Sequence, residues 1–140
     1  MIDVNLVNDK SKTRAKVTPF GQLVTAPLDY SEPVAKSIGA INTAVNFIEP
    51  RSGFAIVITD IIASANKDVS STTPADVEVY ESDEVDSLTV VKEIVRPQLS
   101  RSNNFILTGL NLFIPAGLWV NAKTTDATIL LTIMFYRVPV

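Results

Sequence analysis

The prolines of this 140-residue chain lie almost entirely between its apolar runs and divide it into segments of strand length. Proline cannot donate to a sheet ladder, so in β proteins it marks turns, edges and strand starts. The runs between the prolines are rich in valine, isoleucine, threonine and aromatic residues, which favour strands. No helical period of apolar residues persists for more than about two turns. The pattern therefore predicts an all-β fold.

Polar turns separate the apolar runs and define eight predicted strands. Their ranges are 22–30, 38–48, 54–63, 77–80, 88–95, 105–114, 118–123 and 127–138. Eight antiparallel strands of this length fit a two-sheet sandwich of the jelly-roll type. A seven-stranded immunoglobulin-like sandwich is the alternative, although its Cys–Trp–Cys signature is absent. We expect residues 19–140 to form the sandwich domain.

The alternation of side chains predicts which residues share a face of each strand. One face is expected to carry Ile41, Thr43, Val45 and Phe47 in the second strand; Phe54, Ile56, Ile58 and Ile62 in the third; Ile106, Leu110, Leu112 and Ile114 in the sixth; and Ile129, Leu131, Ile133 and Phe135 in the last. The opposite faces of 54–63 and 127–138 are also partly apolar. We expect them to pack on a copy of the chain, with Leu130, Met134, Tyr136 and Trp119 at the contact.

Composition removes several classes of chemistry. The chain contains neither cysteine nor histidine, so disulfides, thiolate metal sites and Ser-His-Asp or Cys-His catalysis are excluded. Hydrophobic residues make up 46% of the chain and charged residues only 19%, against about 25% charged residues in an average soluble domain. This deficit of charge favours self-association, although a monomer rich in Thr, Ser and Asn would also fit. The net charge of −3 argues against a nucleic-acid or membrane partner.

The first 18 residues form a predicted N-terminal arm, extended or partly disordered when alone. Its four cations Lys10, Lys12, Arg14 and Lys16, with Asp3 and Asp9, give +2, which leaves −5 for residues 19–140. These cations are the predicted partner-binding residues, since they can meet an acidic surface of a neighbouring subunit. Met1–Val17 has no signal-peptide layout, because its lysines follow its apolar residues.

A few motifs allow a test for enzyme chemistry, and none predicts a catalytic, cofactor or metal site. Ser64–Lys67 matches an S-x-x-K spacing, but it follows a strand where the motif needs a helix. Glu49 and Asp60 are the only carboxylate pair considered for glycoside cleavage; Asp60 interrupts an apolar strand and is expected to bond a backbone donor, Arg51 or Arg96. The acidic segment 76–86 is interpreted as a solvated hairpin tip, with calcium or a basic partner as alternatives.

Two stretches carry a resemblance to a known family. They are Arg14–Val34, RAKVTPFGQLVTAPLDYSEPV, and Gly109–Val138, GLNLFIPAGLWVNAKTTDATILLTIMFYRV. Together they resemble small jelly-roll virion proteins of tailed bacteriophages, which act as capsid cement or decoration proteins.

This resemblance implies a non-enzymatic structural protein without cofactor or small-molecule substrate. It would form a homotrimer, bind the major capsid protein at the capsid surface, and be made in the host cytoplasm. The N-terminal arm, with its alternating basic residues, is the predicted contact with the capsid. The alternatives are a receptor- or carbohydrate-binding head of a phage fibre, or a head–tail connector component.

Overall fold

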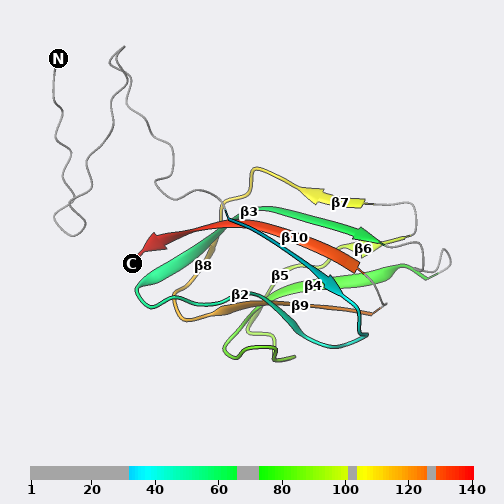
Figure 1. Ribbon diagram of the computed structural model, residues 1–140, viewed down its shortest axis with the longest axis horizontal. Helices are drawn as coiled ribbons and strands as arrows, with labels where there is room; N and C mark the ends of the chain where they lie inside the picture. The colour runs from blue at the N-terminus through cyan, green and yellow to red at the C-terminus, as the bar shows by residue number, and fades with distance from the viewer. Residues whose placement is uncertain (1–31, 66–72, 101–103, 126–128) are drawn as a thin grey trace, which may run out of the picture.

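Two antiparallel sheets stack on each other to form the molecule, as the ribbon of the computed structural model shows (Figure 1). The structure describes residues 32–65, 73–100, 104–125 and 129–140. The strands are β1 (Glu32–Ile38), β2 (Val45–Ile48), β3 (Phe54–Ala65), β4 (Ala75–Ser82), β5 (Lys92–Val95), β6 (Gln98–Leu99), β7 (Asn104–Leu107), β8 (Leu112–Ile114), β9 (Trp119–Thr124) and β10 (Ile129–Pro139). The predicted strand 22–30 and the basic arm lie outside the described residues.

The first sheet has the order β1-β10-β3, with β7 and β8 both paired to the free side of β3. The second has the order β2-β9-β4, with β5 and β6 both paired to β4. Each of these two pairs is one interrupted strand, so the ten strands reduce to eight. Numbered one to eight along the chain, the sheet orders become 1-8-3-6 and 2-7-4-5, which is the jelly-roll arrangement. The predicted fold class is confirmed.

Both interruptions have a local cause. Between β5 and β6 stands Pro97, whose carbonyl still accepts a hydrogen bond from the Val77 N–H over 2.9 Å. Between β7 and β8 stands Gly109, whose φ of +67° lies in the left-handed region that glycine adopts without steric cost. This turn corrects the predicted single strand 105–114. Ile106 faces outward and is 60% exposed, whereas Ile114 is buried.

A second correction concerns the faces of β3. The register of β3 against β10 shifts at Thr59, because Met134 pairs with Asp60 and Phe135 with Ile58. Such a bulge inserts one residue and reverses the alternation beyond it. Ile61 therefore lies in the core with 0% exposure, and Ile62 faces outward, contrary to the prediction.

The predicted strand 38–48 is also wrong as a single element. β1 ends at Ile38, and β2 begins only at Val45, in the other sheet. Asn42, with φ of +50°, lies in the turn between them and fits that turn because asparagine tolerates the left-handed region. Ile41, predicted to share a face with Phe47, is 55% exposed in this turn.

The core lies between the sheets and is apolar. The predicted core face of β10 is confirmed, since Ile129, Leu131 and Ile133 are fully buried and Phe135 is 5% exposed. The inner residues of β3 and β4 pack against this row. Burial of each such side chain contributes about 1.5–3 kcal/mol, which is the main stabilisation in a chain without disulfides. Within the described ranges we find no helix with the length and hydrophobicity that a membrane crossing requires.

Candidate functional site

The carboxylates of segment 76–86 do not converge on one point. Asp76 pairs with Arg96 over 3.4 Å and Glu78 with Lys123 over 3.0 Å. Asp86 accepts a hydrogen bond from the main-chain N–H of Asn46 over 2.7 Å. Among the described residues no group of three or more acidic side chains is placed to hold a metal ion. The described part of this segment therefore offers no calcium site.

Asp60 lies in β3 of the first sheet, whereas Glu49 follows β2 of the second sheet and belongs to no strand. Asp60 is half-buried in β3, where it accepts hydrogen bonds from the Gly109 N–H over 3.3 Å and from the Thr59 hydroxyl over 2.7 Å. The backbone donor expected for Asp60 is thus found at Gly109. The arginines named as alternatives lie elsewhere: Arg96 pairs with Asp76, and Arg51 lies over the Phe54 ring. Glu49 is exposed directly after β2, so the two carboxylates form no pair in the described structure.

The Ser64–Lys67 spacing has no helix to support it. Ser64 lies in β3, and Lys67 lies outside the described residues. The described part of the motif is therefore a strand end, as its sequence context indicated.

The outer face of the first sheet is apolar and almost uncharged. Rows of side chains cross it in register, for example Thr132–Ile62–Ile106 and Tyr136–Val57–Phe113. Ile106, Phe113 and Leu130 are 60%, 53% and 46% exposed. We call this surface the neutral face. Its paired residues are Pro33, Ala35, Ser37, Leu130, Thr132, Met134, Tyr136, Val138, Ala55, Val57, Asp60, Ile62, Ser64, Asn104, Ile106 and Phe113.

Three of the four predicted self-association residues lie on the neutral face. They are Leu130, Met134 and Tyr136, all on β10. Trp119 does not join them, because β9 belongs to the other sheet and Trp119 points to its outer side, opposite Ser82. Sequence reasoning missed Ile106 and Phe113. The signal that could have found Ile106 is Gly109, since a turn there releases the residues on either side from a common alternation.

The outer face of the second sheet is polar, and a loop covers part of it. Residues 83–91, which we call the β4–β5 loop, fold back over β4 and β9 on the side away from the first sheet (Figure 1). Tyr80 and Asn121, which point outward from these strands, are 0% exposed as a result. Large polar side chains buried in this way require hydrogen-bond partners.

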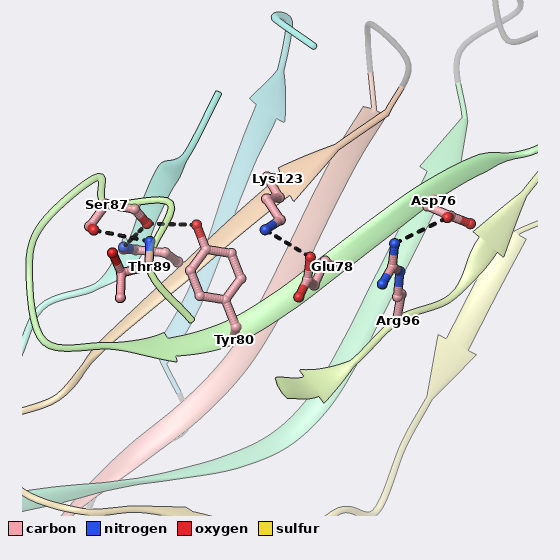
Figure 2. A network of polar contacts seen from close by, with 8 residues as sticks. Asp76, Glu78, Tyr80, Ser87, Thr89, Arg96 and Lys123 are labelled. Carbon is pink, nitrogen blue, oxygen red and sulfur yellow. Dashed lines mark hydrogen bonds and ion pairs between the residues drawn. The ribbon is translucent and has the colours of Figure 1, made fainter. Parts of the chain in front are cut away.

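Those partners are main-chain groups of the loop. The Tyr80 hydroxyl donates to the Ser87 carbonyl oxygen over 2.7 Å (Figure 2). The Asn121 amide donates to the carbonyl oxygens of Glu84 over 3.0 Å and of Ser87 over 3.3 Å. The Asn46 amide donates to the Asn121 side-chain oxygen over 3.2 Å. β4 and β9 therefore bind the main chain of the loop directly, and β2 binds it through the Asn46 N–H and the Asp86 carboxylate.

A shallow groove of 410 Å³ lies beside the loop on the same face. It contains the ion pairs Asp76–Arg96 and Glu78–Lys123, which lie on the two sides of β4 (Figure 2). The Lys123 ammonium also lies 5.1 Å above the Tyr80 ring. Because each cation already has a carboxylate partner, the groove presents little free charge to a ligand.

The same surroundings change the pKa of Tyr80. Burial, and then the negative charges of Glu78 and Asp86, raise the pKa of this phenol from 10.0 to about 12. Burial also raises the pKa of Glu81, which the nearby Lys92 lowers in part. Both shifts act on the stability of the domain, because each group is buried in the folded chain and meets water when the chain unfolds.

The outward side of the β4–β5 loop differs from its inward side. Four apolar side chains point to solvent, namely Val85, Leu88, Val90 and Val91, with exposures from 36% to 51%. Asp83 and Glu84 are exposed beside them. A loop with fixed main chain and exposed apolar side chains is typical of a recognition surface.

No family model, no curated protein and no solved structure matches this chain. Its class is therefore given by its own architecture: an all-β jelly roll with one neutral outer face and one polar, loop-covered outer face.

Proposed function

We propose that the protein is a non-enzymatic virion structural protein, a capsid cement or decoration protein that trimerises on the capsid surface and ties neighbouring capsid subunits together. The resemblance to small phage jelly-roll proteins supports this class.

One observation supports the self-association part of the proposal most strongly, and it is the chemistry of the neutral face. Copies of a chain with net charge −3 repel one another wherever carboxylates meet. On the neutral face the one charged side chain among the register-paired residues is Asp60, which is half-buried and already hydrogen-bonded. Large exposed side chains such as Ile106 and Phe113 surround it and would be removed from water in a contact.

A jelly roll is also well suited to a cementing role for a geometric reason. Its two sheets present opposite outer faces, so one face can contact copies of the chain while the other points away from that contact. In this protein the faces differ in chemistry, since the first is neutral and the second carries the groove and the β4–β5 loop. In a closed ring of copies that contact one another through the neutral face, the β4–β5 loop of every copy would lie on the outside.

Virion composition tests the proposal directly. Intact particles purified from a culture that expresses the protein should contain it, and quantitative mass spectrometry should give its copy number relative to the major capsid protein. Hundreds of copies per particle support cement or decoration. A dozen or fewer would instead support a fibre head or a connector component, and absence from particles would overturn a virion role altogether.

Light scattering coupled to gel filtration tests the oligomer separately. The purified protein should elute as a trimer at micromolar concentration. A monomer at all concentrations would overturn the self-association part, whatever the particle composition shows.

A further inference from the structure

We propose that the outward side of the β4–β5 loop is a docking site for the basic segment Lys10–Lys16 of a neighbouring copy. The inference rests on the self-association part of the proposed function and names a second contact within the oligomer. Three features support this docking site: the fixed conformation of the loop, the apolar and acidic side chains on its outward side, and the basic side chains of the arm.

The loop is already ordered before any partner binds. Its Glu84 and Ser87 carbonyl groups accept hydrogen bonds from Tyr80 and Asn121, both fully buried. The N–H of Val91 donates to the Glu81 carbonyl oxygen over 2.9 Å and closes the loop at its far end. Ordering a loop on binding costs free energy, and a loop fixed in advance avoids that cost. The hydrogen bonds from Tyr80 and Asn121 thus keep the outward side chains of the loop in fixed positions.

The outward residues combine exposed apolar groups with an excess of negative charge. From Asp83 to Glu93 the chain carries four carboxylates and one ammonium, that of Lys92, which gives −3. The Asp86 carboxylate is held by the Asn46 N–H, and the other three belong to exposed residues. The Lys92 ammonium lies 3.9 Å from the buried Glu81 carboxylate rather than beside the exposed acids. Val85 and Leu88, each 51% exposed, lie among these acids. A partner for this surface needs cations together with small or apolar groups.

Residues 10–17, KSKTRAKV, have that composition. In an extended chain successive side chains point to opposite sides. The four cations at positions 10, 12, 14 and 16 would then share one side over about 20 Å, and Ser11, Thr13 and Ala15 would share the other. Elsewhere in the sequence no comparable run of alternating cations occurs, so this segment is the best match that the chain itself offers.

The arm is long enough to reach a neighbour. Sixteen residue steps separate Lys16 from Glu32, where β1 begins, and an extended chain of that length spans up to about 50 Å. β1 belongs to the first sheet, whose outer side is the proposed contact between copies, whereas the loop lies on the outer side of the second sheet. An arm that leaves its own sheet at the contact enters the space of the adjoining copy directly.

Cross-linking between single-cysteine variants tests the inference, because the natural chain has no cysteine. One chain carries Thr13→Cys, which keeps all four cations. A second, differently tagged chain carries Thr89→Cys, at an exposed position of the loop. After exchange of subunits, a short bismaleimide joins the two cysteines, and a product that carries both tags can form only between different copies. The matched control replaces Thr89→Cys by Ser52→Cys, an exposed position in the turn between β2 and β3.

We expect the Thr13–Thr89 product to exceed the Thr13–Ser52 product by about tenfold, because charge attraction concentrates the arm at the loop. Sodium chloride at 1 M should remove the excess, since the screening length falls to about 3 Å. The loop variant Asp83→Lys with Glu84→Lys should remove it too. Adding Lys10→Glu and Lys12→Glu in the arm should restore it.

Equal yields at Thr89 and Ser52, or an excess that survives both salt and charge reversal, would overturn the inference. So would a double variant that carries both cysteines in one chain and yields only a product joined within that chain. Light scattering on the same samples separates the two proposals. An intact trimer without the cross-link refutes only the docking of the arm, whereas monomers throughout refute the self-association on which it rests.

Discussion

The Tyr80 hydroxyl donates a hydrogen bond to the main-chain carbonyl oxygen of Ser87 over 2.7 Å, and this bond ties the β4–β5 loop to the strand beneath it. Tyr80 has no exposed surface, because the β4–β5 loop lies directly over its ring. Tyr80 and Ser87 are seven residues apart in the sequence. The Tyr80 side chain therefore covers the outer side of the second sheet and also fixes the position of the β4–β5 loop.

Replacement of Tyr80 by phenylalanine should destabilise the domain by about 1–3 kcal/mol, because the Ser87 carbonyl oxygen keeps its burial and loses one of its donors. Asn121 still donates to that oxygen, so the loop should loosen rather than detach. Urea unfolding measures the loss, and cleavage by chymotrypsin at Leu88 reports the loosening. An unchanged unfolding midpoint together with unchanged cleavage would show that the bond does not hold the loop.

Stability should fall when the pH rises above 10. The folded-state pKa of Tyr80 is about 12 against 10.0 for a free phenol, so between these values the unfolded chain loses its proton while the folded chain keeps it. Fewer protons on the unfolded state mean that stability decreases with rising pH. The loss can reach about 2.3 kcal/mol at pH 12. Urea midpoints at pH 9, 10.5 and 11.5 should show a decline in the natural protein that Tyr80→Phe largely removes.

Glu81→Gln should stabilise the protein at neutral pH. The Glu81 side chain is almost fully buried, and the partner that counteracts its burial is the exposed Lys92 at 3.9 Å. Burial raises the pKa of Glu81 from its ordinary value of 4.5. Stability is therefore complete below that value and falls as the pH rises through the raised pKa, because ionisation is then more costly in the folded state.

The uncharged amide avoids that cost, so we expect a gain in stability at pH 8 that vanishes near pH 4. Loss of the Lys92 contact should matter little, since ion pairs with an exposed partner contribute little. The control is Glu93→Gln, an exposed carboxylate on the neighbouring strand, which should leave the urea midpoint unchanged at both pH values. A loss of stability in Glu81→Gln at pH 8 would contradict the interpretation.

Sequence predicted most reliably those strands whose alternation is unbroken. In β10 the apolar residues repeat every second position from Ile129 to Phe135, and that whole row is core. The errors occur where one residue resets the alternation. Thr59 bulges out of β3 and exchanges the roles of Ile61 and Ile62. A period of two cannot reveal such a shift, because the inserted residue is itself strand-forming.

The loop-covered face could not be predicted for a different reason. Asn121 and Glu84 are 37 residues apart, and Asn46 and Asn121 are 75 apart. In the sequence both asparagines alternate with apolar neighbours of their strands, a pattern that predicts the solvent side for a polar residue. Their burial depends on a loop from elsewhere in the chain, which no local pattern records.

Arg137 should be needed to hold the two sheets together at one end of the sandwich. Its guanidinium contacts Glu32 of β1 over 3.5 Å, donates to the Glu49 carbonyl oxygen over 3.1 Å, and lies 5.0 Å above the Phe135 ring. A lysine has a single ammonium in place of the planar fork and cannot keep all these contacts. We expect Arg137→Lys to cost about 1–2 kcal/mol.

The matched control is Arg51→Lys, since the Arg51 guanidinium also lies on a phenylalanine ring, 4.7 Å above Phe54, but at an exposed position. That change should stay within about 0.5 kcal/mol. Thermal unfolding of both variants decides the matter. Equal losses would mean that Arg137 contributes only its stacking on a ring and does not join the sheets.

A charge on the neutral face should separate the copies without unfolding them. Ile106 is 60% exposed on β7, and Ile41 is 55% exposed in the turn before β2, so the two isoleucines differ in location rather than in residue type or exposure. Ile106→Lys would place an ammonium in a contact that excludes water, which costs several kcal/mol when no partner is present. We expect the dissociation constant of the oligomer to rise at least about tenfold, as measured by light scattering over a dilution series.

Ile41→Lys should leave the dissociation constant unchanged. Both variants should keep the unfolding temperature of the isolated sandwich, because neither side chain is part of the core. If Ile41→Lys dissociates the oligomer as strongly as Ile106→Lys does, the contact between copies lies at the turn end of the sandwich and the neutral face must face another partner.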